Sequence, residues 1–197
     1  MAHRDDQTLV EKAQAGDREA FRQLFERYHR RIYNCAAYML GSADDAADAT
    51  QEAFVKAWGG LRRLRDPQAL EGWLYRIARN AVHDLARRRR ASREARSGED
   101  AEVALQLAAN EDRGEAATAG LERWELAQTV RVAIQSLPEI HREAVVMYHL
   151  EGMAVKEIAV VLEVPEGTVL SRLARAREAL KRKLGPYVSP GPTGDKP

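Results

Sequence analysis

The sequence predicts an all-α protein of two helical domains joined by a flexible linker. Apolar residues recur at i, i+3, i+4 and i+7 through most of the chain, which is the spacing of one buried helix face. Aromatic residues make up only 6% of the chain, and no stretch alternates apolar and polar residues as a half-buried strand would. Between the two periodic regions, residues 91–120 are polar, charged and rich in alanine, which predicts a flexible or partly helical linker.

These changes in pattern divide the chain into four segments. They are a helical domain over 1–90, the linker over 91–120, a second helical domain over 121–185, and a tail over 186–197 that is rich in Pro and Gly and is expected to be disordered. In the first domain the helical pattern breaks at Gly16, at Gly41 and around Pro67, so we expect a bundle of helices of ordinary length. Asp17 and Ser42 are expected to cap the helices that follow them.

The helix expected from about Ala43 to Trp58 carries an acidic stripe. Its inward side is predicted to hold Ala47, Thr50, Phe54 and Trp58. Another side carries Asp44, Asp48 and Glu52, with Gln51 and Val55 beside them. Acids next to an amide and an aliphatic side chain suit the docking of a basic partner helix. The simpler interpretation is a solvated face whose acids favour the helix N-terminus, and the stripe by itself favours that interpretation.

The helix expected from about Trp73 to Arg90 has a polar side of a different kind. Its buried stripe would be Leu74, Ile77, Ala78, Ala81 and Leu85, and its outward side presents Trp73, Arg76, Asn80, His83 and Arg87. A ring that stacks, an amide that reads a base edge and cations that neutralise phosphate suit the binding of unstacked bases. Equally, Trp73 could fold into the domain core and leave the other side chains as solvated surface.

The stretch from Ala154 to Leu184 has the layout of a helix-turn-helix DNA-binding motif. The buried stripe of its first helix would be Val155, Ile158, Ala159 and Leu162, and that of its second helix Val169, Leu173, Ala176, Leu180 and Leu184. On the second helix Ser171, Arg175 and Arg182 lie opposite the apolar stripe, with Arg172 and Arg177 on its flanks. Gly167 and Thr168 allow the helix start to lie close to phosphate. An ordinary amphipathic helix pair accounts for the same pattern, so the pattern alone leaves DNA binding open.

The composition argues against several other classes of protein. The single cysteine, Cys35, continues a buried apolar stripe and excludes a disulfide framework or a thiolate metal cluster. The first residues lack the apolar region of a signal peptide, and no segment approaches the length of a membrane span, so a cytosolic protein is expected. His83 and Asp84 form the dipeptide of the HD metal phosphohydrolases, but the further ligands are missing and the two side chains point about 100° apart. We therefore predict no catalytic residue, metal site or cofactor.

Three stretches, in this order, resemble the extracytoplasmic-function (ECF) group of bacterial RNA polymerase sigma factors, in the sigma-70 family. They are ADDAADATQEAFVKAW (43–58), GWLYRIARNAVHDLARRRR (72–90) and LPEIHREAVVMYHLEGMAVKEIAVVLEVPEGTVLSRLARAREAL (137–180). The resemblance implies an N-terminal domain that binds core RNA polymerase and opens the minus-ten promoter element. It also implies a C-terminal domain that reads the minus-thirty-five element. ECF sigma factors are commonly controlled by an anti-sigma protein, which is a further expected partner.

The resemblance also implies roles for individual residues. Asp48, Gln51 and Glu52 match the segment that docks on the coiled coil of the largest polymerase subunit. The stretch 64–73 matches the loop that sets minus-ten specificity, and Asn80 matches the pocket for a flipped-out base. Together with the outward side found above, the expected minus-ten residues are Leu64, Trp73, Arg76, Asn80, His83 and Arg87. Thr168, Ser171, Arg172 and Arg175 match positions that contact the minus-thirty-five element, and Arg177 joins them from the basic flank.

The chain departs from the family pattern at several positions. Leu64 stands where many relatives have Phe, and RDPQALEGW replaces a commoner loop, so the minus-ten preference cannot be inferred from other members. Leu170 occupies a position that is often basic. Ala154 lies where Ser or Thr commonly caps a helix, and Glu163 where Gly, Asp or Asn commonly ends it, so both ends should be weakened, the cap by about 0.5–2 kcal/mol. The SLPE stretch that starts at Ser136 is expected to form a capping box.

The main alternative is a stand-alone helix-turn-helix regulator that binds duplex DNA without polymerase. In that protein the N-terminal domain would act as a sensor or a dimerisation unit. The outward side from Trp73 to Arg87 distinguishes the two hypotheses, because a protein that reads only duplex DNA has no need to hold unstacked bases.

Overall fold

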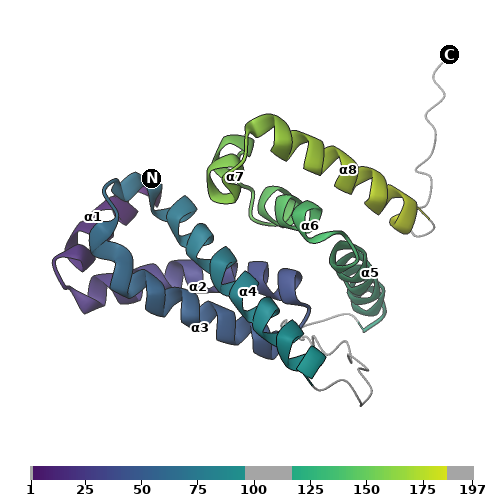
Figure 1. Ribbon diagram of the computed structural model, residues 1–197, viewed down its shortest axis with the longest axis horizontal. Coiled ribbons are helices and arrows are strands. Elements are labelled where there is room, and N and C mark those ends of the chain that lie inside the picture. Colours follow the sequence, from purple (N-terminus) through teal and green to yellow (C-terminus); the bar gives the residue numbers. More distant parts are fainter. Residues whose placement is uncertain (1, 96–116, 186–197) are drawn as a thin grey trace.

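The computed structural model describes residues 2–95 and 117–185, with their side chains over 5–92 and 124–185. Every regular element in these ranges is helical, which confirms the predicted all-α class. In chain order (Figure 1) they are α1 (Ala2–Gln14), α2 (Arg18–Leu40), α3 (Ala43–Gly60), η1 (Leu61–Arg63), η2 (Pro67–Ala69), α4 (Leu70–Ala95), α5 (Ala117–Gln135), α6 (Glu139–Val145), η3 (Val146–Leu150), α7 (Val155–Leu162) and α8 (Glu166–Leu184). None of the described helices is long and apolar enough to cross a membrane.

The ends of the predicted linker are helical. Helix α4 continues to Ala95 and α5 begins at Ala117, so both run into the segment 91–120. The centre of that segment, 96–116, and the tail 186–197 lie outside the described residues.

Helices α1 to α4 form the N-terminal module, in which α2, α3 and α4 contact one another. The predicted caps are present. The Asp17 carboxylate accepts two backbone hydrogen bonds from the first turn of α2, at 2.8 and 3.1 Å, and the Ser42 hydroxyl accepts one from the first turn of α3 at 3.3 Å. Gly41 ends α2 in the left-handed region at φ 74°, where glycine is favoured. Cys35 is a buried core residue as predicted, and burial raises the pKa of its thiol.

The inner face of α3 differs from the prediction. The residues that face the bundle most completely are Ala46, Ala49, Ala53 and Ala57, each at most 1% exposed. Thr50 and Phe54 are buried as predicted, whereas Ala47 is exposed and Trp58 is 40% exposed. Because small side chains allow neighbouring helices to approach closely, the alanines occupy the tightest contact and the larger apolar residues remain at the edge.

Helices α5 to α8 form the C-terminal module. Helix α6 begins at Glu139, directly after Pro138, as expected. The predicted capping box is wrong, because the Ser136 hydroxyl donates back to the Ala133 carbonyl oxygen of α5 at 2.7 Å instead of capping α6. After α6 the chain continues as one π-helical turn, η3, which brings Glu151 to face the N-terminal module.

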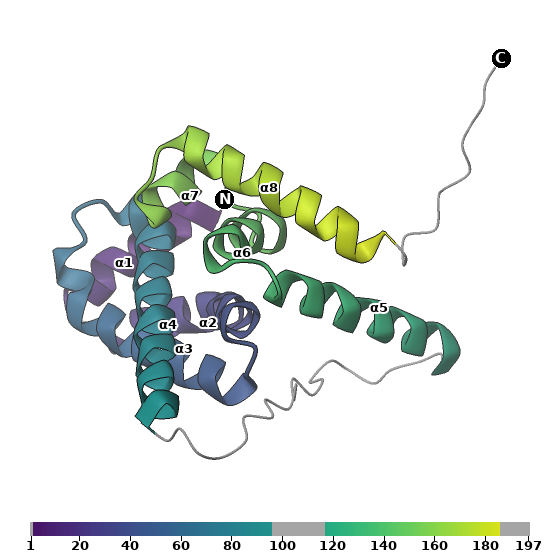
Figure 2. The same ribbon diagram turned by 45° about the vertical axis from the view of Figure 1, so that its right-hand side comes forward.

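Helices α7 and α8 form the predicted helix-turn-helix (Figure 2). Its buried residues include Ile158, Ala159, Leu162, Val169, Leu173 and Ala176, and Val155, Leu180 and Leu184 are half-buried. Ala154 has no side chain that can cap α7, and its backbone N–H instead donates to the Glu157 carboxylate at 2.8 Å. Glu163 ends the helix in the left-handed region at φ 55°, which Gly or Asn adopts at lower cost. Both helix ends thus lack the residues that usually strengthen them.

Candidate nucleic-acid interface and docking surface

The acidic stripe of α3 is only partly available to a partner. Asp44, Asp48 and Gln51 are exposed, and Val55 is 65% exposed beside them. Glu52 is engaged within the module, because it pairs with the Lys56 ammonium at 2.7 Å on α3 and with the Arg88 guanidinium at 2.7 Å on α4. The hydrogen bonds from these two cations lower the pKa of the Glu52 carboxyl. The acidic character that faces solvent therefore comes mainly from Asp44 and Asp48.

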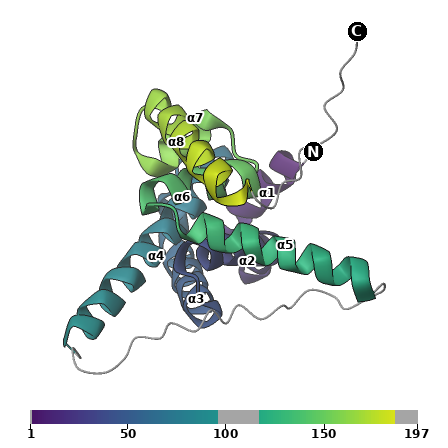
Figure 3. The same cartoon turned by 90° about the vertical axis from the view of Figure 1, so that its right-hand side faces the viewer.

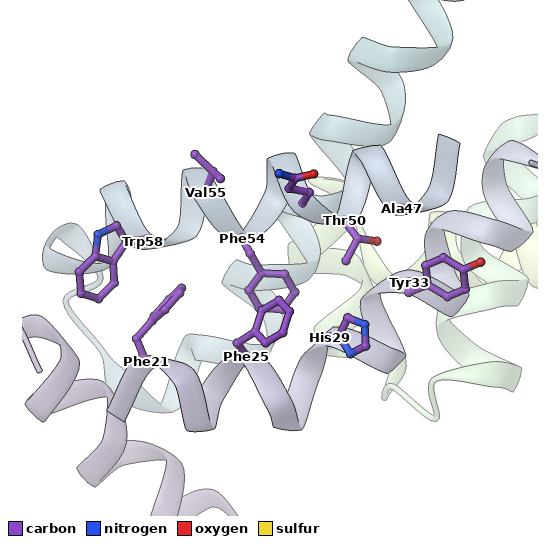
Figure 4. Close-up of a pocket in the computed structure, with 10 residues that line it drawn as sticks. Phe21, Phe25, His29, Tyr33, Ala47, Thr50, Phe54, Val55 and Trp58 are labelled. Carbon is purple, nitrogen blue, oxygen red and sulfur yellow. The ribbon is translucent and has the colours of Figure 1, made fainter. Parts of the chain in front are cut away.

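An apolar groove runs beside this stripe, between α2 and α3 (Figure 4). It has a volume of about 560 Å³, and its walls are Phe21, Phe25, His29 and Tyr33 on α2 with Ala47, Thr50, Gln51, Phe54, Val55 and Trp58 on α3. The rings pack in pairs across it, with centroids 4.8 Å apart for Phe21 and Trp58 and 4.7 Å apart for Phe25 and Phe54. This groove was not among the features predicted from the sequence. Its signal was two aromatic pairs at i, i+4 spacing, which the helical pattern had assigned to the core.

The residues expected at the minus-ten surface lie at different depths. Leu64 is only 8% exposed, and its carbonyl oxygen accepts a hydrogen bond from the Gln14 amide at 2.7 Å. Trp73 is half-buried beside Gly60, where an added Cβ would lie 3.3 Å from the indole ring. The side chain of Leu64 therefore belongs to the core, and Trp73 offers only part of its ring to a ligand.

Four other residues of this surface lie along α4. The Asn80 side chain is exposed and makes no hydrogen bond to any other described residue. Arg87 is exposed and donates to the Asp84 carboxylate at 2.6 Å. Arg76 and His83 instead face carboxylates of the C-terminal module. The structure thus leaves Asn80 and Arg87 open to solvent, whereas Arg76 and His83 are engaged by the other module.

The outer face of α8 is basic and open. Ser171, Arg175 and Arg177 are exposed, and Thr168 and Arg172 are half-buried. The Ser171 hydroxyl donates to the Thr168 carbonyl oxygen at 2.9 Å, which leaves its own oxygen available as an acceptor. None of the three arginines forms an ion pair within the described residues.

His141 on α6 lies beside the basic face, and no helical pattern in the sequence marks it as part of that face. Burial first, and then the positive charges of Arg175 and Arg172, lower the pKa of the His141 ring. The two arginines therefore create a positive potential that reaches α6, which favours a polyanion such as DNA.

Comparisons with known proteins match both helical modules. The family model for sigma-70 region 2 matches residues 24–92, and the model for sigma-70 region 4 matches residues 127–180. The chain is 39% identical over 190 residues to the RNA polymerase sigma-H factor of Pseudomonas aeruginosa, which covers 95% of this chain and 98% of that protein. It is 37% identical over 185 residues to the ECF RNA polymerase sigma-E factor of Escherichia coli, which covers 93% of this chain and 96% of that protein.

Two solved structures are also similar. CnrH, solved in complex with the cytosolic domain of CnrY, matches with a TM-score of 0.69 and 29% identity, over 93% of this chain and 99% of that chain. The sigma factor RpoE of Bartonella quintana, solved with the anti-sigma factor NepR, also matches with a TM-score of 0.69, over 84% of this chain and 96% of that chain. At 23% identity, the second similarity concerns the fold alone.

Proposed function

This chain belongs to the sigma-70 family of RNA polymerase sigma factors, in its ECF group, and from that membership we propose which of its surfaces binds the polymerase and which bind the promoter. Proteins of this family are not enzymes: they bind core RNA polymerase and direct promoter recognition, minus-ten melting and transcription initiation. One observation gives the most direct support to this assignment of polymerase and promoter binding to separate surfaces. The two matched regions, 24–92 and 127–180, fall on the two modules that carry the acidic, base-binding and basic faces.

We assign core-polymerase binding to Asp48, Gln51 and Glu52, with the apolar groove as a neighbouring contact. The exposed acid and amide suit a basic helix of the largest-subunit coiled coil, and Val55 adds exposed apolar area next to them. Glu52 contributes less charge, because Lys56 and Arg88 already neutralise it.

The double variant Asp48→Ala and Gln51→Ala is expected to weaken association with core polymerase about tenfold, because we place both residues among the few interface positions whose truncation costs more than about 1 kcal/mol. Pull-down of core polymerase across a range of sigma concentrations measures the effect. Gln7→Ala with Glu11→Ala is the matched control, because it removes an amide and an acid from the surface of α1. Capture of core polymerase by the α3 variant at wild-type strength would remove this assignment.

We assign minus-ten melting to Trp73, Arg76, Asn80, His83 and Arg87 on α4. Asn80 is the base reader in this proposal, because its exposed amide can donate to and accept from a base edge. Trp73 offers the free part of its ring for stacking, and the cations neutralise phosphate. Leu64 supports the surface from the core, since its buried side chain holds the segment that leads into η2 and α4.

Asn80→Ala is expected to impair open-complex formation and to relax discrimination at one minus-ten base, by about 1–3 kcal/mol if the amide makes a bidentate contact. Closed-complex binding should change little, because the C-terminal module and the core contacts remain. Permanganate reactivity of promoter thymines and holoenzyme binding are measured side by side, with Asn34→Ala on the surface of α2 as the control. Normal reactivity together with normal base preference would contradict the role of Asn80. Loss of both binding and opening would indicate a structural role instead.

We assign minus-thirty-five recognition to Thr168, Ser171, Arg172, Arg175 and Arg177. These residues lie on the solvent side of α8, the second helix of the helix-turn-helix, and such helices enter the major groove. A stand-alone regulator would use the same face. The distinguishing measurement is binding of promoter duplex by the purified protein with and without core polymerase, because a sigma factor of this kind requires the polymerase.

We further propose an anti-sigma protein as a partner and the cytoplasm as the place of action. The relative CnrH was solved with the cytosolic domain of CnrY, which supports control by a bound protein. RNA polymerase works in the bacterial cytoplasm, so a factor that binds it acts there.

A further inference from the structure

The two modules meet across ion pairs that all have the same polarity. Every described pair between them joins a basic residue of the N-terminal module, an arginine or His83, to a carboxylate of the C-terminal module, and the two His83 contacts are ion pairs only when its ring is protonated. The pairs are Arg31–Glu151 at 3.2 Å, Arg76–Glu163 at 3.8 Å, Arg79–Glu143 at 2.6 Å, His83–Glu139 at 2.8 Å, His83–Glu143 at 2.6 Å and Arg90–Glu139 at 3.9 Å. The C-terminal module therefore presents a row of carboxylates to α2 and α4, and Figure 3 shows that module lying beside α4.

Glu143 is the most deeply buried member of this row. Its residue is 1% exposed, and one carboxylate oxygen lies 2.6 Å from Arg79 Nε and 2.6 Å from His83 Nε2. Burial alone would raise the pKa of Glu143, but the hydrogen bonds from His83 and Arg79 lower it. Removing the charge of Glu143 would leave the largely buried Arg79 guanidinium without its partner in the docked arrangement, and the loss of one member of a buried pair is strongly destabilising.

A second set of contacts between the two modules is centred on Glu151. The Glu151 side chain, only 5% exposed, accepts hydrogen bonds from Arg31 and from the hydroxyl of buried Tyr75. Burial and the nearby Glu151 carboxylate raise the pKa of Tyr75, so its hydroxyl stays protonated and donates. The Arg131 guanidinium, on α5, lies 5.4 Å from the centre of the Tyr38 ring on α2. The modules are thus joined by packed and paired side chains on both sides of α4.

The docked module engages two side chains that a DNA strand would use. Arg76 and His83 belong to the surface assigned above to minus-ten melting, and in this arrangement Glu163, Glu139 and Glu143 take the places at which phosphates would bind them. We propose that the C-terminal module masks the part of the strand-binding side of α4 that holds Arg76 and His83, by acting as an anion mimic, with Glu143 as the central latch. This inference rests on the minus-ten assignment of α4. The modules must separate before a strand can bind, and a polyanion competes directly with the module's own carboxylates.

The variant Glu143→Gln tests the latch in the full chain. It keeps the shape of the side chain but removes the charge that holds Arg79 and His83. Small-angle scattering without DNA is expected to show a larger radius of gyration than the wild type. Affinity for a fluorescein-labelled single-stranded oligothymidylate, measured by anisotropy, is expected to rise about tenfold, because a competing state is removed.

The control is Glu178→Gln, on the exposed surface of α8. It removes the same charge from the same module but contacts nothing on α4, so it corrects for the general gain in DNA binding that follows the loss of a negative charge. Glu178→Gln should leave the radius of gyration unchanged. An equal affinity gain in both variants, without opening in Glu143→Gln, would overturn the proposal.

A charge exchange provides an independent test if Glu143→Gln loses helical circular dichroism. Arg79 is outside the assigned strand-binding residues, and Arg79→Glu places a carboxylate against Glu143 and should open the protein. Adding Glu143→Arg should restore the pair and the wild-type radius of gyration. A single Arg79→Glu variant that stays as compact as the wild type would overturn the latch. A larger radius of gyration for Glu143→Gln with no gain in oligothymidylate binding would support the role of Glu143 in holding the modules together. It would contradict the minus-ten assignment of α4 instead.

Discussion

Ile158→Ala is expected to lower the free energy of unfolding of the C-terminal module by about 2–5 kcal/mol, which is the usual cost of removing a large aliphatic side chain from a packed core. Ile158 is fully buried on α7, in the same core as Val169 and Leu173 of α8. Alanine would leave a cavity between the two helices of the DNA-binding motif. Since whole domains are stable by only about 5–15 kcal/mol, a large part of the population should lose the minus-thirty-five reader on modest heating.

Thermal unfolding followed by far-ultraviolet circular dichroism measures this effect, and footprinting of the holoenzyme at the minus-thirty-five element measures its consequence. Val160→Ala is the matched control, because Val160 lies on the same helix and is 61% exposed. The control should change the unfolding temperature very little. If the Ile158→Ala variant unfolds at the same temperature as the Val160→Ala control, the packing of α7 on α8 does not depend on the Ile158 side chain.

Arg175→Ala is expected to reduce minus-thirty-five recognition by about 1–3 kcal/mol if the guanidinium makes a bidentate contact with a base. The residue is exposed on α8 and forms no ion pair with the described part of the chain, so its loss should not disturb the fold. A base contact predicts a loss that depends on the promoter variant. A phosphate contact predicts a uniform loss and a weaker dependence of binding on salt.

Holoenzyme binding to a panel of minus-thirty-five variants distinguishes these outcomes. Lys181→Ala removes the same charge from an exposed position of the same helix, about 120° around its axis from Arg175, and serves as the control. An unchanged footprint for Arg175→Ala would place this face of α8 away from DNA.

Local patterns predicted the elements of this protein well, with errors where packing chose between similar faces. On α3 the helical period was right, but the buried face lies one residue away from the predicted one, because alanines allow close approach and leave Trp58 at the rim of the groove. At Ser136 the residue type suited a cap, but the hydroxyl donates to the Ala133 carbonyl oxygen in the preceding helix. Propensity identifies candidates for such positions, and the competing partners in the fold decide among them.

The sequence by itself determined the all-α class, the breaks at Gly16 and Gly41, the buried stripes of α7 and α8, and the basic outer face of α8. These features depend on residues three or four positions apart, and such spacing is visible along the chain. Only the tertiary structure decided that an apolar groove opens between α2 and α3, and that His83 and Arg76 face carboxylates of the other module. His83 and Glu143 are 60 residues apart, and Arg31 and Glu151 are 120 apart. No local period connects such partners, because their meeting depends on how whole helices pack, and that arrangement sets which faces the protein leaves open to polymerase and DNA.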